Sequence, residues 1–256
     1  NSYIKHSRDN DFTYTGMEQF RGKYLVQNRH TKELYESPQM LYMLVAMTLF
    51  SKYDDSTRIK YVKDYYDAIS QFYISLPTPI MAGVRTPTRQ FSSCVLIESG
   101  DSLDSINATS TSIVKYISKK AGIGIGAGSI RAAGATVGDG SIVHTGLIPF
   151  LKYFQSAVKS CSQGGVRGGA ATVYLPLWHY EFEDLAVLKN NKGTEETRVR
   201  HMDYTFQLNK LMYERLLSGG NITFFDPNDV PGLYESFFID QDKFKEIYET
   251  YERKTS

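Results

Sequence analysis

The stretch LPTPIMAGVRTPTRQFSSCVLIESGDSL, residues 76–103, separates two kinds of sequence pattern in this chain. It opens with two prolines that flank Thr78, enters an apolar run that contains Cys94, and ends in an acceptor-rich turn at residues 98–101. The run predicts a buried strand with a thiol at its start, which makes Cys94 a candidate reactive group. The alternative is an ordinary core cysteine, and residue type alone favours it, because free cysteines are among the most buried residues.

The residues before this stretch, 1–90, predict a mainly helical region. Residues 1–35 have little periodicity and predict short irregular elements. Ser37 and Pro38 form a typical helix start, because serine caps the first turn and proline is tolerated at the first helical position. A second helix is predicted after Ser56. Apolar residues at helical spacing are expected to face the core: Met40, Leu41, Leu44, Val45, Thr48 and Leu49 in the first helix, and Ile59, Val62, Tyr66, Ile69 and Phe72 in the second.

From residue 91 to 256 the pattern changes to short apolar strands that alternate with amphipathic helices. Strands that alternate with helices predict parallel pairing with right-handed crossovers, so the fold class is α/β. Gly122 is expected to cap the C-terminus of the first of these helices. Strands are predicted at 94–97, 122–131, 170–177 and 222–225, and helices at 105–121, 145–161, 179–190, 204–217 and 241–253.

The composition argues against several classes of function. The chain has 29 basic and 28 acidic residues without a long block of either sign, which disfavours a broad nucleic-acid surface. Its longest apolar runs are too short to cross a bilayer, and its N-terminus resembles no signal peptide. Two cysteines in 256 residues indicate a reducing cytosol rather than a disulfide scaffold. The five histidines have no metal-ligand spacing, so no metal site is expected.

Two glycine-rich loops are candidate ligand-binding segments. The first, AAGATVGDGS at 132–141, follows a GIGIGAG segment that lacks the third glycine of a dinucleotide-binding turn. In the second, SQGGVRGG at 162–169, the glycines permit close backbone approach to a ligand. Arg167 could supply charge or a stacking plane there, and Gln163 could bond a base edge. A mobile surface loop is an equally good interpretation of this segment.

Two charged residues near predicted strand ends are further candidates. Asp101 begins the carboxylate turn where a strand meets a helix, although simple N-capping is the alternative. Arg131 ends a strand across from that helix and is a plausible phosphate partner. The segment HYEFE, which starts at His179, is interpreted as a helix start with acids in its first turn rather than as a ligand cluster.

Several segments together resemble one enzyme family from about Lys23 to the C-terminus. They are similar to the large, catalytic subunit of class I ribonucleotide reductase. The resemblance implies a helical region followed by much of the first half of a ten-stranded α/β barrel. The segments are LPTPIMAGVRTPTRQFSSCVLIESGDSLDSI, KAGIGIGAGSIRA, HTGLIPF, KSCSQGGVRGGAAT, LKNN and RVRHMDY.

The resemblance also implies an activity and assigns residues to it. The family replaces the 2′-hydroxyl of a ribonucleotide with hydrogen through a transient thiyl radical, while two further thiols become a disulfide. Cys94 matches the first thiol of that reducing pair, and Thr78 and Ser93 match substrate-binding positions. A deoxynucleotide or ATP effector would bind at a specificity site, with 132–141 as its first loop and 162–169, including Gln163 and Arg167, as the loop that relays effector identity. The matching effector residues are Asp101, Ser102, Leu103, Ser118, Arg131 and Gly138.

The resemblance implies several partners besides substrate and effector. A second copy would pack through the helices at 105–121 and 145–161. The C-terminal part of the large subunit, a metal-containing small subunit that generates the radical, and thioredoxin or glutaredoxin would supply the remaining functions. No cofactor is expected to be bound in this chain itself. The expected location is the cytoplasm, or the host cytoplasm for a bacteriophage protein.

Departures from the family pattern limit what this chain is expected to do alone. The thiyl-radical cysteine, the second reducing cysteine, the radical-relay tyrosines and the C-terminal redox tail lie beyond residue 256, and the N-terminal ATP cone is absent or truncated. Cys161 has no match to the second redox cysteine, and Gly138 stands where some relatives carry arginine. The chain alone is therefore expected to be inactive, either as one piece of a split subunit or as part of a longer chain. The alternative function is a non-catalytic, nucleotide-binding regulatory fragment of the same fold.

Overall fold

The computed structural model describes residues 2–28, 30–163 and 167–255, with the backbone alone for residues 162, 163 and 167. The chain divides into two compact units, Asn1–Ser93 and Cys94–Ser256, which are described separately below. Within the described residues, no helix is both long enough and apolar enough to span a membrane.

The first unit, called the helical unit, consists of short helices around a central one. Its elements are η1 (His6–Asp11), α1 (Tyr14–Gln19), η2 (Phe20–Tyr24), α2 (Pro38–Leu49), α3 (Asp55–Ser70) and α4 (Thr78–Gly83). Both predicted helices are confirmed, and the Ser37 hydroxyl caps α2 by accepting the Met40 N–H at 3.4 Å. α4 was not predicted, because its six residues are too few to show a helical period.

The buried face of α2 differs from the predicted one. Leu41 and Val45 are fully buried as expected, but Met40, Leu44, Thr48 and Leu49 are exposed. α2 contacts α3, α4 and η1 at once, and this shifts its buried arc to the neighbouring positions, among them Gln39, Tyr42 and Ala46. In α3, Tyr66 and Ile69 are buried as predicted, whereas Ile59 is exposed; Phe72, predicted on the same face, lies beyond the end of α3 and is also exposed.

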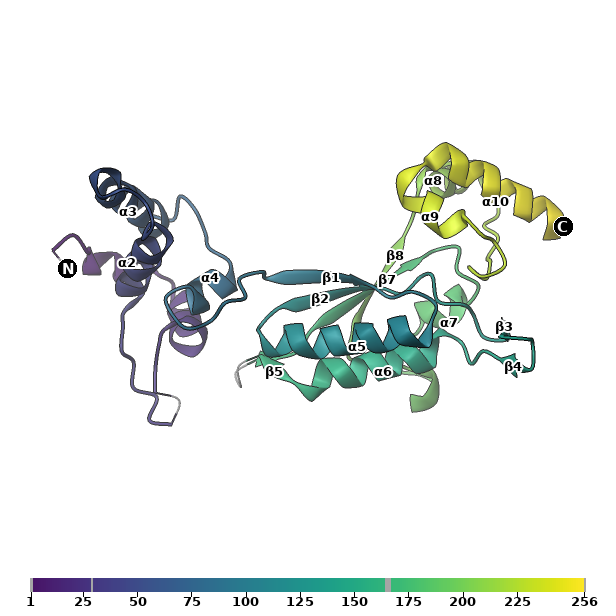
Figure 1. The fold of residues 1–256 in the computed structure, drawn as a ribbon, viewed down its shortest axis with the longest axis horizontal. Helices are drawn as coiled ribbons and strands as arrows, with labels where there is room; N and C mark the ends of the chain where they lie inside the picture. The colour runs from purple at the N-terminus through teal and green to yellow at the C-terminus, as the bar shows by residue number, and fades with distance from the viewer. Residues whose placement is uncertain (1, 29, 164–166, 256) are drawn as a thin grey trace. The chain divides into compact units, whose positions relative to one another are not determined.

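The second unit, called the sheet unit, is built on a parallel sheet, and this confirms the predicted α/β class. The strand order is β1-β2-β7-β8, and every neighbouring pair is parallel. Two helices lie side by side on one face of the sheet and bury their apolar stripes against it (Figure 1). The elements of this layer are β1 (Cys94–Glu98), β2 (Gly122–Gly126), β7 (Ala171–Pro176), β8 (Asp203–Gln207), α5 (Leu103–Ser118) and α6 (Leu147–Ser160).

The remaining elements extend from this layer. A small antiparallel hairpin, β3 (Thr136–Val137) and β4 (Ile142–Val143), projects from the first glycine loop (Figure 1). A second core forms around the fully buried Trp178 and includes residues of α8 (Lys210–Ser218), α9 (Leu233–Ile239) and α10 (Gln241–Thr255). The other short elements are β5 (Ser162–Gln163), β6 (Arg167–Gly168), α7 (Phe182–Ala186) and η3 (Glu195–Thr197).

Several predicted boundaries in the sheet unit are wrong. The helix predicted at 204–217 is strand β8 followed by α8, because residues 203–207 pair with β7. The strand predicted at 222–225 is a single bridge between His179 and Phe225, and α9 was not predicted. Gly122 does not cap α5: the helix ends at Ser118, Lys120 takes the left-handed conformation with φ of 72°, and Gly122 begins β2.

Within the described residues, the β1 side chains that point away from α5 and α6 are exposed, although α9 reaches the carboxyl end of this face. Val95 and Ile97 pack into the core under the helices, while Cys94, Leu96 and Glu98 point the other way and are exposed. Leu96 is 78% exposed. The prediction of a buried strand at Cys94 is therefore wrong, because helices cover only one face of β1.

Candidate functional site

The thiol of Cys94 lies at the amino end of β1, on the open face of the sheet. The side chain is exposed, and its register partner on β2 is Gly122. Leu96 and Glu98 follow on the same face, because side chains two residues apart in a strand share a face. An exposed thiol beside an open sheet face is accessible to a ligand, which an ordinary core cysteine is not.

Glycines in β2 leave a hollow beside this strand face. A Cβ atom at Gly124 would lie 2.4 Å from Leu96 Cδ2, and one at Gly126 would lie 1.9 Å from Glu98 Oε2. The glycines thus let the β1 side chains lie across β2. The cavity here is about 400 Å³ and is lined by residues of β1, β2, β7, β8 and α9, among them Tyr174 and Tyr234.

Glu98 and Tyr234 form a polar contact at one end of this cavity. The Tyr234 hydroxyl donates a short hydrogen bond to Glu98 Oε1. Burial and this carboxylate together raise the pKa of Tyr234, so the phenol stays protonated and remains a donor. The contact fixes the direction of the Glu98 carboxylate at the end of β1 opposite Cys94.

The predicted effector residues Asp101 and Arg131 do come together, at the carboxyl edge of the sheet. Arg131 Nε and Nη2 both lie 2.7 Å from Asp101 Oδ2, and the Arg131 N–H donates to Asp101 Oδ1 at 2.9 Å. Arg131 Nη1 also donates to the Thr136 carbonyl oxygen, on the first glycine loop, at 2.7 Å. The two side chains are only about one-fifth exposed, at 21% and 23%. The Arg131 guanidinium thus connects the Asp101 turn to the first glycine loop.

The other predicted effector residues are placed differently. Ser102 caps α5 by accepting the Ser105 N–H at 3.2 Å, and Leu103 beside it is 69% exposed. Gly138 is exposed in the β3–β4 hairpin, where its φ of 63° favours glycine. Ser118 lies at the opposite end of α5, about 24 Å from Ser102 at 1.5 Å per residue. One copy of the chain therefore does not bring Ser118 to Asp101.

The second glycine loop is described only in part. Gln163 and Arg167 pair across β5 and β6, and residues 164–166 lie outside the described residues. The predicted roles of the Gln163 and Arg167 side chains therefore stay predictions.

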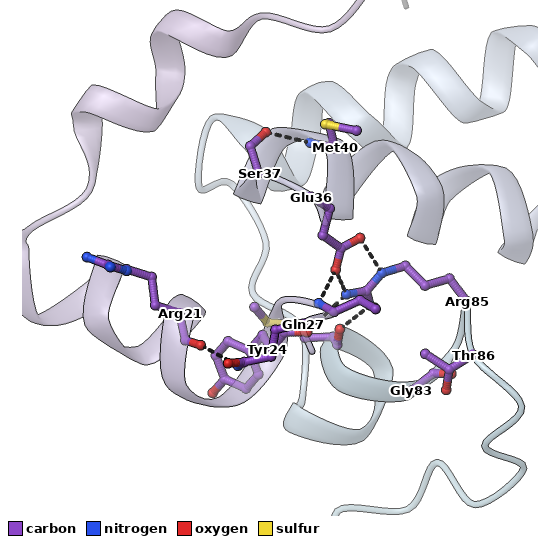
Figure 2. A network of polar contacts seen from close by, with 11 residues as sticks. Arg21, Tyr24, Gln27, Glu36, Ser37, Met40, Gly83, Arg85 and Thr86 are labelled. Carbon is purple, nitrogen blue, oxygen red and sulfur yellow. Dashed lines mark hydrogen bonds and ion pairs between the residues drawn. The ribbon is translucent and has the colours of Figure 1, made fainter. Parts of the chain in front are cut away.

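In the helical unit, Thr78 lies in the first turn of α4. Its hydroxyl is 3.4 Å from the Tyr24 hydroxyl. A buried ion pair supports the other end of α4 (Figure 2): Arg85 Nε donates to Glu36 Oε2 at 2.9 Å, and both side chains are at most 5% exposed. Arg85 also donates to the carbonyl oxygens of Met81 and Tyr24. Ser93, the last residue of this unit, is exposed.

Cys161 ends α6 and packs partly into the core between the sheet and its two helices. Cys94 points to the opposite face of the same sheet, so the structure gives no reason to pair these two thiols. Among the described residues no cluster of histidine, cysteine, aspartate or glutamate has the arrangement of a metal site.

Three polar residues near the predicted effector residues Asp101 and Arg131 were not predicted. His179 Nε2 is 3.0 Å from the Ile130 carbonyl oxygen, Asp226 accepts the Ala132 N–H, and Glu181 accepts the Leu147 N–H. His179 and Glu181 follow the carboxyl end of β7, just as Asp101 follows β1. Ligand sites in open parallel sheets gather at this edge, and that rule is the signal that could have identified the HYEFE segment.

Comparisons with known proteins agree with this geometry. The family model described as "Ribonucleotide reductase, barrel domain" matches residues 92–256, and "Ribonucleotide reductase, all-alpha domain" matches residues 10–89. A ribonucleoside-diphosphate reductase subunit alpha from Haemophilus influenzae is 68% identical over 251 residues, which are 98% of this chain and 33% of the relative. The Escherichia coli subunit alpha is 65% identical over 255 residues, which are 100% of this chain and 34% of the relative. A subunit alpha from Buchnera aphidicola is 66% identical over 252 residues, which are 98% of this chain and 33% of the relative. The chain thus spans about a third of the length of these relatives.

Proposed function

Because the chain belongs to the ribonucleotide reductase family, we propose that it forms part of the large subunit of a ribonucleoside-diphosphate reductase. In this proposal residues 1–90 are a helical domain and residues 91–256 are part of the first half of the α/β barrel. The observation that carries the proposal is the exposed thiol of Cys94 on the open face of a parallel sheet. That face would be the inner wall of the barrel.

Cys94 would serve as one of two reducing thiols. The substrate's 2′-hydroxyl leaves as water and a hydrogen takes its place on carbon, while two thiols are oxidised to one disulfide. The two electrons and two hydrogens that the thiols give up balance the C–O bond broken and the C–H and O–H bonds formed. Residues 1–256 would supply Cys94 together with the substrate contacts of Thr78 and Ser93, and Cys161 would take no part.

Asp101, Ser102, Leu103, Arg131 and the Gly138 backbone would form the effector site. The exposed end of α5 and the Arg131 guanidinium offer the hydroxyl, apolar and cationic groups that a nucleoside triphosphate needs. Gln163 and Arg167, in the second loop, would relay the identity of the bound effector to the substrate base.

The position of Ser118 supports an effector site shared between two copies of the chain. Asp101 and Ser118 lie near opposite ends of α5, about 24 Å of helix apart. Two antiparallel copies of α5 would bring Ser118 of each copy to the Asp101 end of the other. The surface of α5 and α6 offers exposed aromatic side chains for such packing, Tyr116 on α5 and Tyr153 on α6.

The remaining partners follow from the same proposal. A metal-containing small subunit would generate the radical, thioredoxin or glutaredoxin would reduce the disulfide, and the rest of the large-subunit sequence would supply the radical cysteine and the second thiol. The reaction would take place in the cytoplasm.

Replacement of Cys94 tests the proposal. In the intact reductase that contains this chain, Cys94→Ser should abolish multiple-turnover reduction of CDP with a dithiol reductant, while effector binding is retained. Cys161→Ser is the matched control and should keep the parent rate. Parent-like turnover in Cys94→Ser would refute the redox role. Nucleotide binding without any thiol-dependent turnover of the parent protein would favour the regulatory alternative.

A further inference from the structure

The first effector loop leaves and re-enters the sheet unit at two neighbouring segments, Ile130–Ala133 and Gly146–Leu147. We call these two segments together the loop base. A hydrogen-bonded pair of backbone segments closes the loop above it: the Gly134 N–H donates to the His144 carbonyl oxygen at 3.0 Å, and the His144 N–H donates to the Ala135 carbonyl oxygen at 2.8 Å. The loop base therefore sets the direction in which the whole hairpin leaves the sheet.

Three successive backbone groups of the loop base are held by side chains from other parts of the sheet unit. The Ile130 carbonyl oxygen contacts His179 Nε2 at 3.0 Å, and the Ala132 N–H donates to Asp226 Oδ2 at 3.0 Å. Between them, the Arg131 N–H donates to Asp101 at 2.9 Å. The backbone on either side of Arg131 is thus held by His179 and Asp226, whereas its guanidinium is held by Asp101 and the Thr136 carbonyl oxygen.

His179 is fully buried, and its protonation state follows from its contacts. Nδ1 accepts the Glu181 N–H at 3.2 Å, so the hydrogen of the neutral ring is on Nε2 and is donated to the Ile130 carbonyl oxygen. Burial lowers the pKa of His179 and favours this neutral ring. A buried neutral histidine with both nitrogens bonded is a rigid spacer between β7 and the loop base.

Glu181 connects the two ends of the loop. Its Oε2 accepts the Leu147 N–H at 2.9 Å, at the point where the loop ends and α6 begins. Burial raises the pKa of this carboxyl, and the backbone groups of Leu147 and Ala133 oppose that shift. A Cβ atom at Gly146 would lie 2.5 Å from Glu181 Oε1 and 2.9 Å from Ala133 Cβ. Glycine at this position, with φ of 89°, therefore lets the carboxylate sit between the entry and the exit of the loop.

The segments that carry these side chains are themselves fixed. His179 and Phe225 form a parallel bridge, and Phe225 packs into the core around Trp178. Asp226 additionally accepts the Asn228 N–H at 2.8 Å through its other oxygen. His179 and Asp226 thus lie on segments that the bridge and the core around Trp178 hold in place.

We propose that His179, Glu181 and Asp226 are positioning residues for the effector site: they preorganise the loop base so that Arg131 and the hairpin meet the nucleotide without further ordering. This inference rests on the proposed effector role of Arg131. Preorganisation raises affinity because the loop need not be ordered at the moment of binding. Since Glu181 also binds the first residue of α6, the same side chain connects the effector loop to a proposed dimer helix.

Equilibrium titration of the intact reductase with dTTP, dGTP and ATP, each separately, tests this. Glu181→Ala should weaken nucleotide binding about tenfold, because the loop must then be ordered on binding, while the number of sites per chain and the KM for CDP stay unchanged. Glu181→Gln keeps one acceptor oxygen, enough for the Leu147 N–H, and should recover part of the affinity that Glu181→Ala loses. Glu252→Gln is the matched control, since that carboxylate binds Arg215 and Thr223 in the same unit. It should leave nucleotide affinity unchanged.

The outcomes separate this inference from the proposed function. If Arg131→Ala binds nucleotide as tightly as the parent, or the parent binds none, the effector role itself fails. If Arg131→Ala loses affinity but Glu181→Ala does not, the positioning role alone is overturned. A fall in the number of sites at unchanged Kd in Glu181→Ala would mean partial unfolding, and would also overturn it.

A measurement on the parent protein keeps the inference testable if Glu181→Ala does not fold. The amides of Ala132 and Leu147 should be protected from hydrogen exchange before any nucleotide is added, because Asp226 and Glu181 already accept them. Rapid exchange of both amides without nucleotide, followed by protection on binding, would show that the loop base is ordered by the ligand and would overturn the inference.

Discussion

The two units support their proposed ligand residues in different ways. In the helical unit, the segment that carries Thr78 depends on the Glu36–Arg85 ion pair, whose side chains are 4% and 5% exposed (Figure 2). In the sheet unit, the Asp101–Arg131 pair is 23% and 21% exposed, and His179 and Asp226 hold the backbone on either side of Arg131. One pair is part of a core, and the other lies at an edge that water and a ligand can reach.

This difference bears on which pair is free to change partners. A charge in a dry core must keep its partner, because an uncompensated buried charge is costly. Arg131 can exchange Asp101 for a phosphate at lower cost, since water already reaches both groups. The helical unit is thus expected to act as a fixed support, and the carboxyl edge of the sheet unit as the responsive part.

The largest effect should come from removing one charge of the buried pair. Arg85→Met leaves Glu36 buried without its partner and releases the carbonyl oxygens of Met81 and Tyr24, so it should destabilise the helical unit by about 3–5 kcal/mol. Hydrogen exchange of amides in α2 and α4 measures this loss. Fluorescence of Trp178, the chain's single tryptophan, reports unfolding of the sheet unit separately and should keep its transition.

A double variant sharpens this prediction. Glu36→Leu with Arg85→Met removes both charges together, and it should recover part of the stability that Arg85→Met loses, because no unpaired charge remains. Arg215→Met in the sheet unit is the control, since its partner Glu252 is 23% exposed, and its cost should be smaller. If Arg85→Met and Arg215→Met lost the same unfolding free energy, the buried ion pair of the helical unit would matter no more than the partly exposed pair of the sheet unit.

A smaller effect is expected where the second glycine loop meets the core. A Cβ atom at Gly169 would lie 2.3 Å from the Val158 carbonyl oxygen and 2.9 Å from Ile117 Cγ2. Backbone and a buried side chain cannot move aside easily, so Gly169→Ala should destabilise the sheet unit by about 1–3 kcal/mol. Urea unfolding followed by Trp178 fluorescence measures the change.

The adjacent glycine provides the comparison for this variant. A Cβ atom at Gly168 would meet nothing within 4 Å, so Gly168→Ala should be close to neutral. If both variants lost the same stability, the cost would come from the backbone preference of glycine rather than from the tight packing against α5 and α6.

Some of this organisation could be predicted from sequence and some could not. Helices α2, α3, α5 and α6 were found because each is long enough to show a 3.6-residue period. Only α2 starts at the predicted cap; α5 and α6 begin at Leu103 and Leu147, each two residues from the predicted start. α4 and α9, with six and seven residues, are too short for a period to appear. Residues 203–207 form a strand because they pair in parallel with β7, and this long-range pairing cannot be read from the local sequence.

The candidate site likewise has features that the sequence predicted and features that it did not. Asp101 and Arg131 were predicted as separate candidates, and the resemblance assigned both to the effector site; the structure brings them into contact. The exposure of Cys94 could not be predicted, because an apolar run does not reveal that helices cover only one face of its strand. The Glu36–Arg85 pair was missed altogether: Arg85 lies in the 76–103 stretch, but its partner is 49 residues away in sequence and lies in none of the quoted segments.

The smallest effect compares the helix caps of the two units. Ser37 caps α2 and Ser102 caps α5, each by accepting a backbone N–H, so each Ser→Ala variant should cost about 1 kcal/mol of unfolding free energy in its own unit. Only Ser102 is also a proposed effector residue. Added dTTP should therefore stabilise the parent and Ser37→Ala equally, and Ser102→Ala less, because stabilisation by a ligand follows its affinity for the folded state. Thermal unfolding without nucleotide measures the cost of losing each cap, and unfolding with dTTP measures the stabilisation by the nucleotide. If dTTP stabilised Ser102→Ala as strongly as the parent, Ser102 would be a structural cap like Ser37, and the responsive edge of the sheet unit would begin at Asp101 and Arg131 alone.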